Sequence, residues 1–272
     1  MTYKGYDVLQ LSDEELAEFY EGKLDLDYLV ENEYLILKNS EGRCVDKYVY
    51  QKGAFEKLSY STIKGFDDII KPRNVEQELA FHLLQDPFTK IKLLTGVAGS
   101  GKDFLMFNQA RHLVDKGKFS KIAFCRPNVT VGDVPDIGYL PSGVNEKLAW
   151  TMAPLYDKVG GEAHLKGLIE AGTIELIPLL FIRGRSFENS IIYITEGQNM
   201  TPETLALIVS RLGDGSELWI NADTDQIDRK VYKENNGVKR MIDRFAGQPL
   251  FGYVELQETE RSEVAKLAKL LY

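Results

Sequence analysis

Short apolar runs alternate with amphipathic segments of helical period from residue 73 onward. Such runs are typical of buried parallel strands, and such segments are typical of helices that cover a sheet. The predicted strands cover residues 91–95, 121–125, 173–178, 190–195, 217–222 and 253–256. The predicted helices cover residues 75–84, 102–115, 145–159, 202–211 and 262–271. The pattern therefore predicts an α/β domain with a mostly parallel sheet.

Residues 1–72 follow a different pattern. A short helix is predicted at residues 11–22, because Ser12 can cap it and Glu15 completes a capping box. Its predicted apolar face holds Leu16, Phe19 and Tyr20. Three β-rich runs follow, at residues 34–38, 44–50 and 55–58. We predict a small N-terminal helix and β-meander appendage, too thin to be stable alone, that packs on the larger domain (residues 73–272) or on a neighbouring subunit.

Composition narrows the class of protein. The chain of 272 residues has 33 Lys and Arg against 41 Asp and Glu, a net charge of −8, so nucleic-acid contact would need a local basic surface. No apolar run approaches the ~20 residues of a membrane helix, and the first residues lack a signal core. Cys44 and Cys125 form no disulfide or metal-ligand pattern. We expect a protein without a membrane segment in the reducing cytoplasm.

A glycine-rich loop carries the chemistry. It follows the predicted strand at residues 91–95, opens the helix at residues 102–115, and reads Gly96-Val97-Ala98-Gly99-Ser100-Gly101-Lys102-Asp103-Phe104. Such a loop wraps backbone N–H groups around a phosphate, and its lysine reaches the outer phosphates of a nucleoside triphosphate. The sequence therefore predicts a P-loop that binds ATP with Mg²⁺, or with Mn²⁺.

Two positions depart from the usual P-loop pattern. Asp103 stands where a Ser or Thr normally binds the metal, and Thr195 ends an apolar strand where a metal-binding Asp is expected before Glu196. The carboxylate and the hydroxyl look exchanged, so we predict a rearranged metal site formed by Asp103, Thr195 and Glu196. The alternative is a degenerate site that binds nucleotide without hydrolysing it.

An ordered series of motifs resembles the PhoH family of P-loop ATPases along most of the chain. The matching segments are Arg126-Pro127, Gly132, Ile137-Gly-Tyr-Leu-Pro141, Glu146-Lys147, Pro154-Leu-Tyr-Asp157, Arg183-Gly-Arg185, Glu196-Gly-Gln-Asn199, Asp223-Thr-Asp-Gln226-Ile-Asp and Glu260-Arg261-Ser262. The resemblance is strongest to the ATPase part of fusions with a PIN nuclease, and implies a RecA-like P-loop fold. Asp103, Thr195 and Ala222 depart from the family pattern. No PIN domain precedes Met1, so we expect the nuclease activity of the fusions to be absent here, with a separate nuclease as a possible partner.

The resemblance assigns roles to individual side chains. Glu196 is the expected general base or water-orienting group, and Gln226 resembles a γ-phosphate sensor. Gln77 resembles the adenine-reading glutamine of helicase-like ATPases. Arg183 and Arg261 are the preferred candidates to act on the γ-phosphate, ahead of Arg185 and Arg211, although a single arginine is more often a structural ion-pair residue.

A locally basic segment with an aromatic residue spans residues 228–244 and could track a phosphate backbone, although a solvated helix face explains most such charge runs. The resemblance implies an ATPase that assembles as a hexameric ring and acts on RNA or single-stranded nucleic acid. A nucleotide-dependent assembly module with weak or no hydrolysis is the second interpretation. A phosphotransferase is the third, without a legible lid or acceptor pocket.

Overall fold

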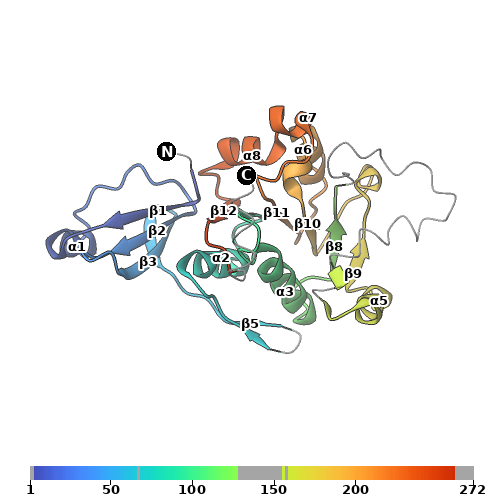
Figure 1. Ribbon diagram of the computed structural model, residues 1–272, viewed down its shortest axis with the longest axis horizontal. Coiled ribbons are helices and arrows are strands. Elements are labelled where there is room, and N and C mark those ends of the chain that lie inside the picture. Colours follow the sequence, from blue (N-terminus) through green and yellow to red (C-terminus); the bar gives the residue numbers. More distant parts are fainter. Residues whose placement is uncertain (1–2, 66–67, 128–154, 157–158, 261–272) are drawn as a thin grey trace.

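The computed structural model describes residues 3–65, 68–127, 155–156 and 159–260 (Figure 1). The predicted helix at residues 262–271 lies outside the described residues, and so does most of the one at residues 145–159. Among the described helices, none has the length and apolar character needed to cross a membrane.

A six-stranded sheet forms the centre of the larger domain. Its strands are β7 (Ile91–Gly96), β8 (Lys121–Cys125), β9 (Ile174–Leu176), β10 (Ser190–Ile194), β11 (Glu217–Asn221) and β12 (Phe251–Leu256). They lie in the order β12-β7-β11-β10-β8-β9, and every neighbouring pair is parallel. The predicted α/β fold with a mostly parallel sheet is confirmed.

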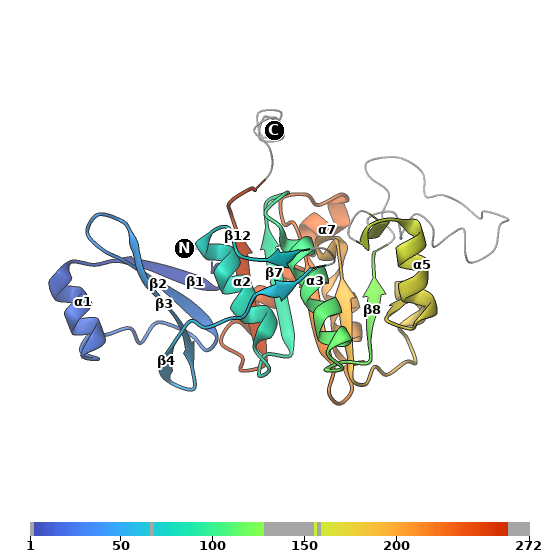
Figure 2. The same cartoon turned by 90° about the horizontal axis from the view of Figure 1, so that it is seen from below.

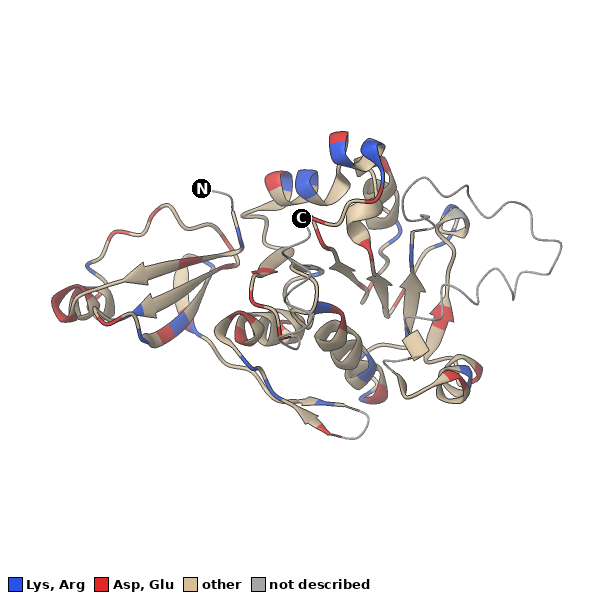
Figure 3. Ribbon diagram, viewed as in Figure 1, with Lys and Arg blue, Asp and Glu red and all other residues tan. Residues whose placement is uncertain are grey.

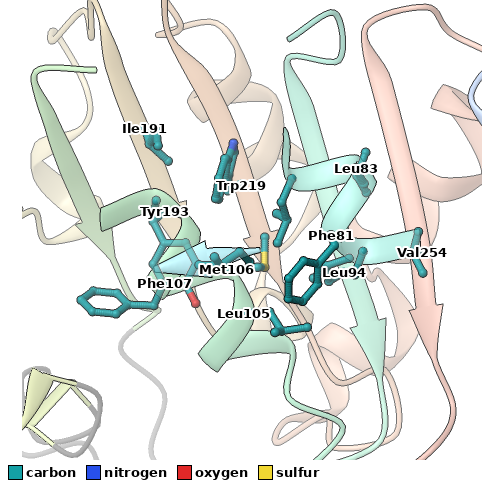
Figure 4. Packing of buried hydrophobic residues seen from close by; sticks show 14 of the residues in the cluster. Phe81, Leu83, Leu94, Leu105, Met106, Phe107, Ile191, Tyr193, Trp219 and Val254 are labelled. Atoms are coloured by element: carbon teal, nitrogen blue, oxygen red, sulfur yellow. The ribbon is translucent and has the colours of Figure 1, made fainter. Parts of the chain in front are cut away.

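Helices cover both faces of this sheet (Figures 1 and 2). The helices are α2 (Val75–Gln85), α3 (Lys102–Asp115), α5 (Glu162–Glu170), α6 (Pro202–Val209), α7 (Lys230–Glu234) and α8 (Gly237–Phe245). Side chains alternate along a strand, so Tyr193 of β10 and Trp219 of β11 pack with α2 and α3, whereas Ile192 and Ile194 pack with α6 and α8. Figure 4 shows the first of these two cores, with Tyr193, Phe107 of α3 and Trp219 in it.

The N-terminal region is a four-stranded sheet with one helix. Its elements are β1 (Tyr6–Gln10), α1 (Asp13–Tyr20), β2 (Glu33–Lys38), β3 (Cys44–Gln51) and β4 (Ala54–Lys57). The strands β2 to β4 form the predicted antiparallel meander, but β1 was missed and pairs in parallel with β2. A two-stranded hairpin, β5 (Ile63–Lys64) and β6 (Ile69–Ile70), leads to α2.

The predicted capping box of α1 is present, since the Ser12 side chain accepts the Glu15 N–H and the Glu15 carboxylate accepts the Ser12 N–H. Leu16 is buried as expected. Tyr20 was wrongly placed on the buried face, because its ring is 52% exposed and its hydroxyl donates to Asp46 at 2.8 Å. Tyr20 therefore faces solvent, whereas its neighbour Phe19 is buried.

The N-terminal sheet packs directly on the larger domain. The Asn32 side-chain amide donates to the carbonyls of Gln248, Pro249 and Phe251 at 2.9 to 3.2 Å. The Tyr34 hydroxyl lies 3.0 Å from His82 Nδ1 on α2, and Tyr34 shares one apolar core with α2 and α3. The thin N-terminal sheet is therefore supported by the larger domain, as one of the two predicted arrangements requires. The domain boundary at residue 72 stays a prediction.

Candidate nucleotide-binding site

The glycine-rich loop joins the end of β7 to the start of α3. Gly96, Gly99 and Gly101 have φ values of 131°, 82° and 90°, a region that side chains rarely adopt. Gly101 is the N-cap residue of α3 and has no side chain that could accept a hydrogen bond. The first N–H groups of the helix therefore receive no capping oxygen from Gly101. This arrangement is suited to an anionic phosphate.

Lys102 lies with its side chain folded into the loop. Its Nζ donates to the carbonyls of Gly96 at 2.6 Å and Val97 at 2.8 Å, and lies 3.4 Å from Ser100 Oγ. The residue is only 7% exposed. Phosphate oxygens can replace these carbonyls as acceptors without moving the lysine away from the loop.

Asp103, on the first turn of α3, meets the side chains at the end of β10 and β11. The Tyr193 hydroxyl donates a hydrogen bond to the Asp103 carboxylate. The Asn221 amide in turn donates to Thr195 Oγ1 at 3.5 Å. Burial and the Asp103 charge raise the pKa of Tyr193 well above its usual range, against a small opposing effect of Asn221, so the phenol keeps its proton and remains the donor. The structure thus brings the two exchanged positions, Asp103 and Thr195, to one end of the sheet.

Glu196 lies two residues after the end of β10, and a buried glutamine holds its side chain. Its backbone is left-handed, with φ 58°, and its carboxylate accepts from Gln198 Nε2 at 2.7 Å. The same Nε2 lies 3.2 Å from the Gln226 carbonyl, and Gln198 Oε1 accepts the Asp223 N–H at 2.9 Å. Gln198 is 1% exposed, so this link between the two loops is shielded from water.

The loop after β11 carries Asp223 and Gln226. Burial raises the pKa of the Asp223 carboxyl, and the Lys102 ammonium opposes that rise, which shows that this loop lies within electrostatic range of the P-loop lysine. Gln226 is exposed, and its described contacts are made by its backbone. Its role as a γ-phosphate sensor stays a prediction.

Gln77 contacts the P-loop itself. Its Nε2 donates to the Ser100 carbonyl at 3.0 Å, its Oε1 accepts the Arg73 N–H at 2.9 Å, and the residue is 4% exposed. In this conformation the Gln77 amide nitrogen and oxygen both bind backbone groups, so neither is turned toward a base. Phe104, one residue beyond Asp103, is 49% exposed. Contacts of either residue with adenine stay predictions.

A segment after β12 also crosses the P-loop. The Thr259 hydroxyl donates to the Ala98 carbonyl at 3.2 Å, and the Glu260 N–H donates to the Gly99 carbonyl at 3.0 Å. The Glu76 carboxylate of α2 accepts the N–H groups at 257 and 258 and holds this segment. Arg261, the next residue, lies outside the described residues.

The other candidate arginines are spread along the chain. Arg183 is exposed, and no described contact joins it to the P-loop. Arg185 pairs with Glu175 at 2.7 Å and lies over the Phe187 ring, which is a structural arrangement. Arg211 follows α6, and its carbonyl accepts the Phe187 N–H at 3.0 Å near the amino ends of β10 and β11. Within one subunit, Arg211 therefore stands at the opposite end of these strands from Lys102.

The side-chain oxygens at this end of the sheet fit a divalent cation that also binds the phosphates of a nucleotide. Among the described residues, no three His, Cys, Asp or Glu side chains gather into a site that could hold a metal alone. Mg²⁺ in nucleotide sites commonly takes one or two protein oxygens and completes its shell with phosphate and water. The Asp103 carboxylate and the Thr195 hydroxyl are oxygens of that kind; Tyr193 contacts the first and Asn221 the second.

Two members of the site were missed in the sequence. Tyr193 and Asn221 lie within apolar strands, where a tyrosine or asparagine resembles ordinary core or strand-end filling. The available signal was the period of two, which places Tyr193 on the same strand face as Thr195.

A cavity of about 780 Å³ lies elsewhere, between α5 and the edge strand β9. Leu165, Ile169 and Leu176 contribute to its lining, and three strands separate β9 from the P-loop strand β7. It contains none of the candidate site residues.

Comparisons with known proteins identify the family of the chain. The family model of the PhoH-like protein matches residues 69–272. The chain is 34% identical to protein PhoH2 of Bacillus subtilis over 98% of its length, and 35% identical to protein PhoH2 of Mycolicibacterium smegmatis over 73%. It spans 63% and 46% of those two relatives. Unliganded Pif1 from Bacteroides sp. aligns over 75% of the chain and 45% of Pif1, with 17% identity and a TM-score of 0.34. The family match and the relatives show that the chain belongs to the PhoH family.

Proposed function

We propose that this protein hydrolyses ATP. The observation that supports the proposal best is the meeting of two loops at the carboxyl end of the sheet. The Tyr193 hydroxyl donates a hydrogen bond to Asp103 on α3, and Tyr193 lies within electrostatic range of Glu196. Lys102 lies within electrostatic range of Asp223, on the loop after β11. Tyr193 thus links the helix that follows the P-loop to the strand that leads to Glu196, and phosphoryl transfer to water requires a phosphate-binding lysine and a water-activating carboxylate at one site.

Each side chain has a distinct task in this proposal. Lys102 and the first N–H groups of α3 bind the β- and γ-phosphates and orient the terminal phosphorus for attack. Glu196, fixed by Gln198, accepts the proton of the attacking water. A bound Mg²⁺, held by Asp103 and Thr195, would neutralise charge on the phosphate oxygens.

Phosphate release from ATP tests the proposal. We expect Mg²⁺-dependent turnover by the native chain and none above background for Lys102→Ala. Asp103→Thr should lower turnover, because it leaves two hydroxyls and no carboxylate at the metal positions. Adding Thr195→Asp should restore turnover by returning one carboxylate to the pair. Native turnover equal to that of Lys102→Ala, with nucleotide still bound, would refute hydrolysis.

A nucleotide-dependent assembly module is the second candidate function. It is favoured by the departures at Asp103 and Thr195 and by the phenol that already occupies part of the Asp103 carboxylate. This candidate predicts nucleotide-dependent assembly in the absence of phosphate release. Sedimentation in ATP and in a non-hydrolysable analogue separates the two functions, and also tests the proposed hexameric ring.

The proposed partner is RNA or single-stranded nucleic acid in the cytoplasm. Lys and Arg residues gather on α7 and α8, as the blue segments of the ribbon in Figure 3 show. The exposed members are Lys230, Lys233, Lys239, Arg240 and Arg244. The surface adjoins the site, because the Asn199 amide donates to the Asp228 carboxylate at 2.6 Å just before α7. A separate nuclease partner is part of the same proposal, and co-purification of a ribonuclease with the native chain would test it.

A further inference from the structure

Tyr193 is a buried core residue whose hydroxyl is not required for its apolar packing. The side chain has no exposed surface, and its ring packs 6.4 Å from Phe107 and 5.6 Å from Phe124, measured between centroids. A phenylalanine would make the same apolar contacts. A buried hydroxyl is costly unless it is hydrogen-bonded, and here its acceptor is the Asp103 carboxylate.

The register of the sheet puts Tyr193 beside the proposed metal ligands. Tyr193 lies on the sheet face that α3 covers, and the alternation of side chains along the strand, continued one residue past β10, puts Thr195 on the same face. Asn221 lies on that face at the end of the neighbouring strand β11 and donates to Thr195 at 3.5 Å. The phenol thus contacts the P-loop carboxylate, and the amide contacts the strand hydroxyl, at the same end of the sheet.

We propose that Tyr193 is a positioning residue for the divalent cation that accompanies the nucleotide. Its hydroxyl fixes the Asp103 carboxylate so that this group and the Thr195 hydroxyl face the cation together. A carboxylate has about four acceptor positions, so one phenol donor is compatible with a bound cation. The exchange of Asp103 and Thr195 therefore includes a third residue. This inference depends on the proposed nucleotide–metal site and is independent of hydrolysis.

Binding of a fluorescent, non-hydrolysable ATP analogue tests the role of Tyr193. The affinity is measured across a series of Mg²⁺ concentrations and in EDTA. Tyr193→Phe keeps the ring and removes the hydroxyl, and we expect the half-saturating Mg²⁺ concentration to rise about tenfold or more, as for other residues that orient metal ligands. The affinity in EDTA should stay as in the native chain.

Tyr34→Phe is the matched control. Tyr34 is also buried, at 2% exposed, and its hydroxyl lies 3.0 Å from His82 Nδ1, away from the P-loop. We expect this variant to keep the native Mg²⁺ requirement. In Asp103→Asn the Mg²⁺ dependence of binding should be lost, and adding Tyr193→Phe should cause no further loss, because both changes act on one interaction.

Three results would overturn the inference: native binding that is independent of Mg²⁺, an unchanged Mg²⁺ requirement in Tyr193→Phe, or an equal loss of affinity in Mg²⁺ and EDTA. Turnover of ATP is scored separately on the same proteins. An increased Mg²⁺ requirement without turnover would support the role of Tyr193 and refute hydrolysis. Turnover with an unchanged Mg²⁺ requirement in Tyr193→Phe would do the reverse.

Discussion

Replacing Gln198 with leucine is expected to damage stability and turnover together. The buried side chain makes one hydrogen bond to the Glu196 carboxylate at 2.7 Å and two to backbone groups of the neighbouring loop, at 2.9 and 3.2 Å. A bond to a charged group contributes about 1.5–3 kcal/mol and a neutral one about 0.5–1.5 kcal/mol, so Gln198→Leu should lose about 3 kcal/mol or more. For a domain of this size that corresponds to a fall in Tm of about 6–12 °C.

The effect on catalysis follows from the role proposed for Glu196. A displaced catalytic group commonly costs about 100-fold in rate, so kcat should fall by about that factor. The KM for ATP should change little, because Lys102 and the N–H groups of the P-loop are untouched. Steady-state phosphate release and thermal unfolding on the same preparations measure both effects.

Gln109 offers a matched control within the same protein. It is 3% exposed on α3, and among the described residues its Oε1 has no hydrogen-bond partner. Gln109→Leu should therefore be neutral or stabilising, because it removes a buried acceptor that is unsatisfied. Equal losses of Tm in the two variants, or native kcat in Gln198→Leu, would refute the role assigned to Gln198.

Three further outcomes are expected. Burial lowers the pKa of His82 from 6.5, so the unfolded chain binds a proton that the folded one does not, and stability should fall as the pH drops below 6.5; urea titrations should show a weaker fall for His82→Asn. Gly96→Ala should abolish nucleotide binding and lower Tm, because its φ is 131° and a methyl group would meet a backbone carbonyl of β12, whereas Gly117→Ala, strained but in open space, should only lower Tm. Lys239→Ala and Arg240→Ala should each weaken RNA binding and lower its salt dependence, by about one in the log–log slope measured by fluorescence anisotropy; an unchanged slope would place the RNA elsewhere.

Much of the larger domain could be predicted from the sequence because its signals are local. The P-loop glycines, the apolar strand before them and the helix after them lie within one continuous stretch, and α3 begins and ends where predicted. Strand β1 was missed for the opposite reason. Its partner β2 is separated from it by α1 and a loop, so the parallel pairing depends on a contact that no local pattern reveals.

The roles of polar side chains inside apolar strands were harder to predict from the sequence. Tyr193 looks like a core aromatic until α3 brings Asp103 against it. Lys92 is a similar case, because this lysine of β7 is 1% exposed and pairs with Glu217 of β11 at 3.0 Å. Both partners come from elements distant in the chain. Sequence periodicity gives the face on which such a side chain lies, whereas its partner follows from the packed fold.

The contact between the residues just before β1 and the last described strand, β12, has a practical consequence for labelling the protein. The Glu255 N–H donates to the Lys4 carbonyl at 3.0 Å, and the Tyr3 and Tyr253 rings lie 5.8 Å apart between centroids. A fluorophore attached at Tyr3 would lie beside β12, whose following segment contacts the P-loop through Thr259 and Glu260, and is expected to obstruct or report on nucleotide binding. The exposed turn at Ser40, at the other end of β2 from Asn32, is the better insertion point for an inert label.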